Sequence, residues 1–220
     1  MRTELQDLIE RMCLSEPIVD SSQSISWAAH REAEMVTDKS IAAELSTFLT
    51  GRTTKGQRKA AYFILGKLGK NTQSHECADA LIGFINKEKD KYVLSTMLDV
   101  LADIRKPIGI DLSPVYQLLG DSRWLVRHSA IKSLKNSESS EAEAHVLAHL
   151  EVTEDPYDIV YCHATLNCIG TELAIPLLQR GLKSRKRDVK SSADQAILAI
   201  QHRTLPPNST FDTDALRPSI

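Results

Sequence analysis

The stretch DSRWLVRHSAIKSL, Asp121 to Leu134, decides the fold of this chain. Val126, Ala130 and Leu134 recur four residues apart, which places them along one side of an α-helix. Asp121 precedes that helix and is a typical N-cap residue, because its carboxylate can accept hydrogen bonds from the free N–H groups of the first turn. The stretch therefore predicts an amphipathic helix with a capped start and a small residue, Ala130, at its centre.

The same pattern returns along the whole chain. Helical segments can be centred on six small or flexible residues that lie 31 to 36 residues apart: Ala29, Ala61, Met97, Ala130, Cys162 and Ala193. Cap-type residues precede five of these segments: Thr54, Asp90, Asp121, Asp155 and Ser184. A period of this length is the signature of a helical repeat array, because each helix pair buries its apolar side only by stacking on its neighbours.

A further amphipathic segment lies between successive centres, for example ECADALIGFI and EAEAHVLAHL. Glycine and proline are sparse, and no stretch alternates as a half-buried strand would. We therefore predict an all-α fold, a right-handed α-solenoid (α-α superhelix) of about six helical hairpins in a single domain over residues 1–201. The expected repeats are 1–37, 38–70, 74–106, 111–137, 141–170 and 171–201, and the proline-rich segment 202–220 is expected to be a flexible tail.

The repeat resembles the HEAT repeat. DSRWLVRHSAIKSL carries its pattern of Asp, Val-Arg, Ala and Leu, AIPLLQRGLKSRKRDVKSSADQAILAI follows the pattern through a whole unit, and KGQRKAAYFILGKLG keeps its Ala, Leu and Leu-Gly. The chain is similar to the short HEAT-like and phycobilin-lyase-type repeat proteins of bacteria. This resemblance implies the solenoid fold but specifies function poorly.

Composition limits the classes of function. The 220 residues are 42% hydrophobic and 25% charged, and the formal net charge of -2 gives no overall attraction to nucleic acid or to an anionic membrane. No apolar run approaches the ~18 residues of a membrane span, and the first residues lack the apolar core of a signal peptide, so we expect a cytoplasmic protein. The four cysteines form no CxxC pair, which predicts buried thiols rather than a zinc or redox site.

One segment resembles an enzyme site. HEAT-type deoxyhypusine hydroxylases hold two irons with His-Glu dyads, and VRHSAIKSL resembles their dyad segment around His128. The equivalent positions here contain one histidine and no glutamate, which cannot assemble a carboxylate-bridged di-iron centre. We predict no catalytic residue, no metal site and no cofactor, and an enzyme is the less favoured interpretation.

The second helix of each repeat is expected to present a concave face opposite its buried stripe. Aromatic and charged groups share that face, which favours a partner surface. The predicted partner-binding residues are Trp27, Arg31, Lys59, Tyr62, Phe63, Asp99, Trp124, His128, Lys132, His163 and Asn167. Structural alternatives stay open: Tyr62 and Phe63 enter the core if the helix phase differs by about 40°, His163 is an interior histidine, Asp99 forms an ion pair with a lysine, and Arg127 pairs with an acidic group of a neighbouring repeat.

Basic residues also gather in the turns before the second helices, in GRTTKGQRK, NKEKDK, DSRWLVR and KSRKRDVK, with an acidic gap at EVTEDPYD. Such an edge either keeps the protein soluble or meets phosphates or an acidic protein. We predict a non-catalytic scaffold or adaptor that binds another protein through the concave second-helix face, and the resemblance adds an immunity-type inhibitor of a toxin as a specialisation. The alternatives are a nucleic-acid-binding or HEAT-like DNA-glycosylase-type protein and a phycobilin-lyase-like role.

Overall fold

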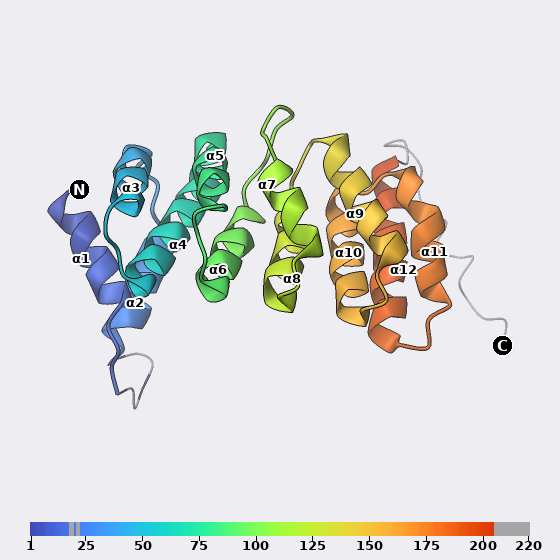
Figure 1. The fold of residues 1–220 in the computed structure, drawn as a ribbon, viewed down its shortest axis with the longest axis horizontal. Coiled ribbons are helices and arrows are strands. Elements are labelled where there is room, and N and C mark those ends of the chain that lie inside the picture. Colours follow the sequence, from blue (N-terminus) through green and yellow to red (C-terminus); the bar gives the residue numbers. More distant parts are fainter. Residues whose placement is uncertain (18–19, 21–22, 205–220) are drawn as a thin grey trace, which may run out of the picture.

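A computed structural model describes residues 1–17, 20 and 23–204 of the chain. Within these ranges all regular elements are helices, and the one sheet-like contact is an isolated bridge between Lys106 and Ser137. The helices stand side by side in a row that runs from the N-terminus to the C-terminus (Figure 1). This arrangement is the all-α solenoid expected from the sequence. None of the helices in the described ranges is both long and apolar enough to cross a bilayer.

Each repeat contributes a first and a second helix. The first helices are α1 (Thr3–Met12), α3 (Ile41–Thr50), α5 (His75–Phe84), α7 (Ser113–Tyr116) with the 3₁₀ helix η2 (Gln117–Gly120), α9 (Ser140–Val152), and η3 (Glu172–Ala174) with α11 (Ile175–Leu182). The second helices are α2 (Ile25–Glu34), α4 (Lys55–Thr72), α6 (Lys91–Leu101), α8 (Trp124–Ser133), α10 (Pro156–Ile169) and α12 (Arg187–Thr204). Residues 202–204, expected in the tail, belong to α12, and the remainder of that segment, 205–220, lies outside the described residues.

The second helices form a continuous layer in which α2 contacts α4, α4 contacts α6, α6 contacts α8, α8 contacts α10 and α10 contacts α12. All six centres predicted from the sequence are fully buried in this layer. The approach of α4 to α6 depends on Gly66, since a Cβ at that position would lie 2.3 Å from the Cβ of Val100. Small residues at the crossing points therefore let successive repeats pack closely.

The predicted helix caps are confirmed at Thr54, Asp90 and Asp155, which are the N-cap residues of α4, α6 and α10. The prediction is wrong for Asp121 and Ser184, which lie two residues before the N-cap Arg123 of α8 and three residues before the start of α12. Thr54 and Gln57 form a capping box, in which each side chain accepts a hydrogen bond from the backbone N–H of the other. The side chains of four further residues accept from an N–H two or three residues later: Asp90, Asp121, Asp155 and Ser184. The caps fix where the second helices begin, and their first turns lie together along one edge of the solenoid, the lower edge in Figure 1. We call this edge the first-turn edge.

The buried side chain of Lys106 caps the C-terminal end of α6. Its Nζ donates to the carbonyl oxygens of Leu101 at 3.0 Å and Ile104 at 2.7 Å. Burial lowers the pKa of Lys106 to about 7. The backbone N–H of Lys106 donates to Asn136, and its carbonyl accepts from Glu138, so the segment after α6 is tied to the turn after α8.

The four cysteines differ in burial. Cys77 and Cys162 are buried, whereas Cys13 and Cys168 are exposed, so the expectation of buried thiols is wrong for two of them. Cys13 follows the last residue of α1, and Cys168 lies in the last turn of α10. Neighbouring helices cover such ends less completely than they cover the middle of a helix, which a period-based prediction does not register.

Candidate functional site

Four aromatic side chains stand exposed on the first-turn edge. Trp27 on α2, Tyr92 on α6, Trp124 on α8 and Tyr157 on α10 are 51%, 53%, 61% and 68% exposed. Each lies within the first three residues of its helix. Since α6, α8 and α10 are successive neighbours, three of the four rings follow one another from repeat to repeat. We call these four residues the aromatic row.

Basic side chains lie against two rings of the aromatic row. The guanidinium of Arg31 is 5.4 Å from the centroid of the Trp27 ring. The ammonium groups of Lys55 and Lys91 are 4.7 Å and 5.1 Å from the centroid of the Tyr92 ring. Cations at these distances are attracted to the ring face. The first-turn edge is therefore a mixed aromatic and basic surface.

The eleven residues predicted to bind a partner separate by burial. Trp27, Arg31, Lys59 and Trp124 are exposed, whereas Phe63, Asp99, Lys132 and Asn167 are partly buried. Tyr62, His128 and His163 are buried, so the expectation that they face solvent is wrong. The sequence also missed Tyr92 and Tyr157, although both come directly after a Lys or Pro that follows a capping Asp. A search for aromatic residues at that position would have found them.

The three buried residues are covered by neighbouring elements. The ring of Tyr62 packs against Phe84 at the end of α5, with 5.9 Å between the ring centroids. His128 stacks on Tyr161 of α10 at 4.7 Å. His163 on α10 shares a hydrogen bond with Ser192 of α12 at 2.9 Å, and burial lowers its pKa to about 4. A second helix therefore buries a wider arc than one stripe, because its own first helix and both neighbouring second helices contact it.

Other predicted contact residues already have partners between repeats. Lys132 on α8 pairs with Asp99 on α6 at 2.9 Å, as the ion-pair alternative expected. The amide of Asn167 donates to the backbone carbonyl of Gln195 on α12 at 3.0 Å. Both contacts join successive second helices. They support the stacking of repeats, and they leave the aromatic row as the more available surface.

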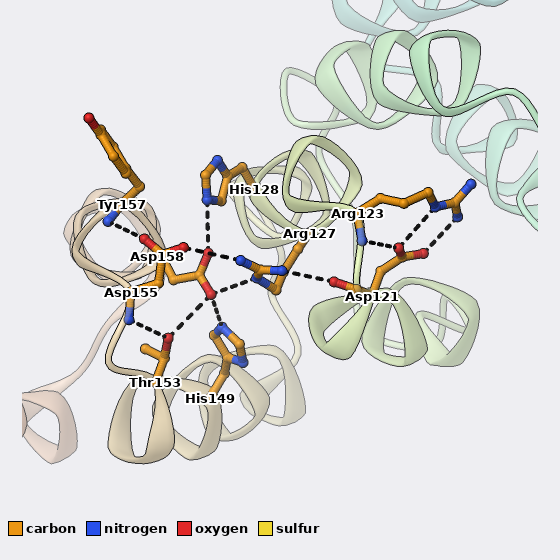
Figure 2. Close-up of polar contacts among 9 residues, drawn as sticks. All are labelled: Asp121, Arg123, Arg127, His128, His149, Thr153, Asp155, Tyr157 and Asp158. Carbon is orange, nitrogen blue, oxygen red and sulfur yellow. Dashed lines mark hydrogen bonds and ion pairs between the residues drawn. The ribbon is translucent and has the colours of Figure 1, made fainter.

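A buried ion cluster lies beside Tyr157 (Figure 2), and the ring of His128 in this cluster is 5.5 Å from the ring of Trp124 and 6.3 Å from that of Tyr157. The carboxylate of Asp158 is at its centre and is only 3% exposed. Arg127 donates from Nε to Oδ2 of Asp158 at 2.6 Å, and Nε2 of His149 lies 3.1 Å from the same oxygen. Nε2 of His128 lies 2.8 Å from Oδ1. These side chains come from α8, α9 and α10, so the cluster joins two repeats.

Protein donors stabilise the charged form of Asp158. Burial alone would raise the pKa of Asp158, but the hydrogen bonds from Arg127 and His149 outweigh that effect, and the pKa lies below its ordinary value. Arg127 also reaches Asp155 at 3.2 Å and donates to the backbone carbonyl of Asp121 at 2.9 Å. The expected pairing of Arg127 with an acidic group of the next repeat is thus confirmed.

An equivalent arginine lies two repeats earlier. Arg58 is three residues before its centre, Ala61, as Arg127 is three residues before Ala130. Its Nε donates to Glu88 of the next repeat at 2.7 Å, and Nη1 donates to the carbonyl of Thr53 at 3.1 Å. The sequence placed Arg58 among the basic residues of the turn GRTTKGQRK; its pairing with the next repeat was not predicted, although the same offset from the centre marks it.

Three residues of the Asp158 cluster have the donor types of a metal site. His128, Asp155 and Asp158 each offer one ligand atom, and these atoms lie within 4.8 Å of one another. However, Arg127 already contacts both carboxylates, and a metal ion would have to displace its positive charge. The residues present therefore fit an internal ion pair better than a metal centre.

The Asp158 cluster is also unsuited to act as a general base. Oδ2 of Asp158 is contacted by Arg127, by His149 and by Thr153 at 3.2 Å, and Oδ1 faces His128. A general base needs an oxygen within hydrogen-bond reach of the substrate. Oδ2 faces three protein donors, whereas Oδ1 and Nε2 of His128 lie 2.8 Å apart without forming a hydrogen bond, and both atoms are buried away from solvent. No substrate can therefore reach either oxygen directly, and the cluster joins the repeats.

Comparison with known proteins supports the fold. No family model matches the chain, and no curated protein matches it. Among solved structures, a designed armadillo repeat protein is similar, with 15% sequence identity, a TM-score of 0.51, and coverage of 89% of this chain and 99% of that one. This likeness defines the class, an α-helical repeat solenoid. Membership of the HEAT family stays a prediction from the repeat pattern.

Proposed function

We propose that the chain is a non-catalytic, cytoplasmic scaffold that binds another protein through its second-helix layer, with the aromatic row at the centre of the contact. The supporting observation is that four large aromatic side chains are more than half exposed at similar places in four repeats. Tyrosine and tryptophan are enriched at protein interfaces and among the residues that carry most binding energy. A solenoid offers such side chains as one extended surface.

The proposed surface differs from the one predicted by sequence. It keeps Trp27, Arg31, Lys59 and Trp124, and it adds Tyr92 and Tyr157. Phe63, Asp99, Lys132 and Asn167 are partly buried and lie farther along their helices, away from the first turns. Tyr62, His128 and His163 are not part of this surface because their side chains are buried.

A partner capture experiment tests this proposal. The wild-type chain and the double variant Trp124→Ser, Tyr157→Ser are used as bait in extract of the native cell, with quantitative mass spectrometry of the bound proteins. Leu173→Ser is the matched control, because Leu173 is a 77% exposed apolar residue in η3, at the start of a first helix. We expect a partner that the wild type and the control retain and the double variant loses, with unchanged circular dichroism.

Equal recovery by all three baits would refute the assignment of the aromatic row. The finer prediction, that the chain neutralises a toxin, belongs to the same proposal and is supported if the retained partner is an enzyme whose activity falls on binding. Recovery of nucleic acid instead of protein, lost in the double variant, would favour the nucleic-acid alternative.

A further inference from the structure

A cleft opens on the first-turn edge beside the aromatic row. It lies between the turn that joins α3 to α4, residues 51–54, and the segment that joins α5 to α6, residues 85–90. Its volume is about 730 Å³. Tyr92 of the aromatic row lies directly after the second of these segments, so the cleft and the row form one surface. We call it the α3–α6 cleft.

The α3–α6 cleft carries more positive than negative charge. Four basic residues and two acidic ones line it. The two acids already have cations: Glu88 pairs with Arg58 at 2.7 Å, and Asp90 pairs with Lys55 at 2.9 Å. Among the described residues no carboxylate pairs with the remaining three cations, Arg52, Lys87 and Lys89. The cleft is therefore a local basic site on a chain whose net charge is -2.

The wall of the cleft also contains a polar group without an internal partner. Tyr62 lines the cleft and is only 2% exposed, yet no residue in the described part of the chain hydrogen-bonds its hydroxyl. The hydroxyl oxygen is not among the fully buried polar atoms that lack a partner, so the small exposed part of Tyr62 includes this oxygen, and the hydroxyl is open to the cleft. Burial raises the pKa of Tyr62 to about 12, so the hydroxyl keeps its proton and can donate a hydrogen bond at neutral pH.

From this geometry we infer that the α3–α6 cleft binds the carboxylate of an acidic segment of the partner protein, with the Tyr62 hydroxyl donating to it. Arg52, Lys87 and Lys89 supply the charge that attracts the carboxylate, and the neighbouring Tyr92 contacts the rest of the segment. The inference rests on the proposed scaffold function and adds the chemistry of the partner. A hydrogen bond from a neutral donor to a charged acceptor is stronger than one between two neutral groups. The single Tyr62 hydroxyl in the cleft therefore binds a carboxylate more strongly than a neutral acceptor.

A direct binding assay tests this inference without the natural partner. The probe is a fluorescein-labelled hexaglutamate peptide, measured by fluorescence anisotropy with the full chain at about 0.02 M salt, where exposed charges are weakly screened. Labelled hexaglutamine is the neutral control, and a labelled oligothymidylate of equal charge tests for a nucleic acid. We expect binding of hexaglutamate and no binding of hexaglutamine.

Two variants and a matched control locate the binding. Tyr62→Phe removes only the hydroxyl, and we expect it to weaken hexaglutamate binding about fivefold, as loss of a hydrogen bond to a charged group does. Arg52→Ala with Lys89→Ala should weaken it at least about tenfold, because two unpaired charges are lost. Lys183→Ala with Lys186→Ala removes the same charge from the turn before α12, away from the cleft, and should change it less than about twofold.

Three outcomes would overturn the inference: hexaglutamate binding that is unchanged in Tyr62→Phe, an equal loss in the Lys183 and Lys186 control, or tighter binding of the oligothymidylate that depends on the cleft residues. The double variant of Trp124 and Tyr157 should bind hexaglutamate as the wild type does. Failure of the cleft therefore appears in this assay, and failure of the aromatic row appears in the capture experiment.

Discussion

Replacement of Asp158 by Asn should destabilise the protein far more than the same change at Asp99. Both carboxylates form ion pairs between successive second helices, Asp158 with Arg127 at 2.6 Å and Asp99 with Lys132 at 2.9 Å. The difference is burial. The Asp158 side chain is 3% exposed and that of Arg127 16%, whereas those of Asp99 and Lys132 are 41% and 37% exposed.

The magnitudes follow from these environments. Removing one partner of a buried pair costs roughly 3–5 kcal/mol, and Asp158→Asn should fall at the lower end, about 3 kcal/mol, because Arg127 keeps Asp155 at 3.2 Å. For a chain of this size that corresponds to a melting temperature lower by about 6–12 °C. Asp99→Asn should cost at most about 1 kcal/mol.

Urea unfolding followed by circular dichroism measures both variants. The pKa of Asp158 is lowered in the folded state, so its contribution is present above the ordinary aspartate pKa and disappears as the pH falls through the folded value. The gap between wild type and Asp158→Asn should therefore be present at neutral pH and should close as the pH falls below about 4. An Asp158→Asn variant no less stable than Asp99→Asn would show that the cluster does not hold the repeats together.

Two further predictions concern the packing of α6. The pKa of Lys106 is about 7 in the folded chain and 10.5 ordinarily, so the unfolded chain binds the proton more tightly. The free energy of unfolding of the wild type should therefore rise by up to about 1.4 kcal/mol per pH unit between about pH 7 and 10. Lys106→Met should abolish this pH dependence. Parallel urea midpoints for the two proteins across that range would contradict this. Gly66→Ala should destabilise by about 1–3 kcal/mol through the clash with Val100, whereas Gly83→Ala in α5, where a Cβ would meet nothing within 4 Å, should stabilise by up to about 1 kcal/mol. Thermal melts of both variants test the contrast, and equal effects would refute it.

The sequence predicted the elements of the solenoid because those elements depend on local patterns. Ala130 and the other five centres are buried, and Asp155 and two other caps accept the expected hydrogen bonds, since period and cap chemistry act within one helix. Arg127 was also interpreted correctly. This role needs only an acidic residue in the next repeat, and it does not depend on how the two repeats are aligned with each other.

The burial of individual side chains could not be predicted in the same way. Tyr62 directly follows its centre, Ala61, and so lies near the boundary between the buried stripe and the open face, where a small rotation of the helix decides exposure. His128 is two residues before Ala130 and lies nearly opposite the buried stripe, so its burial depends on the neighbouring repeat. What covers His128 is Tyr161 of the next repeat, and the helix crossing that places it there is not encoded in either segment alone. Within the acidic gap at EVTEDPYD, Asp155 caps α10 as predicted, whereas the burial of Asp158 was not predicted, because Arg127 and His149 that cover it come from other helices.

Arg58 and Arg127 lie at equivalent positions in their repeats. The first-turn edge is nevertheless open beside Arg58 and filled beside Arg127. At Arg127 the surrounding space is filled, because His149 and Thr153 complete Asp158 from below and His128 faces it from above. At Arg58 the acid, Glu88, also accepts from the backbone N–H of Asp90 at 2.9 Å, but among the described residues no histidine contacts it, and it lines the α3–α6 cleft.

The same arginine–carboxylate pair between repeats is therefore part of a buried ion cluster at Arg127 and borders a basic cleft at Arg58. The residues around each arginine account for the difference. Both sites lie next to exposed aromatic rings, Trp124 and Tyr157 beside the ion cluster and Tyr92 beside the cleft. A partner that lies along the aromatic row would meet a rigid surface at α8 and α10 and a charged pocket at α4. The proposed function and the proposed carboxylate site together predict that the partner supplies an extended segment, with an acidic residue at the α3–α6 cleft and apolar residues along the aromatic row.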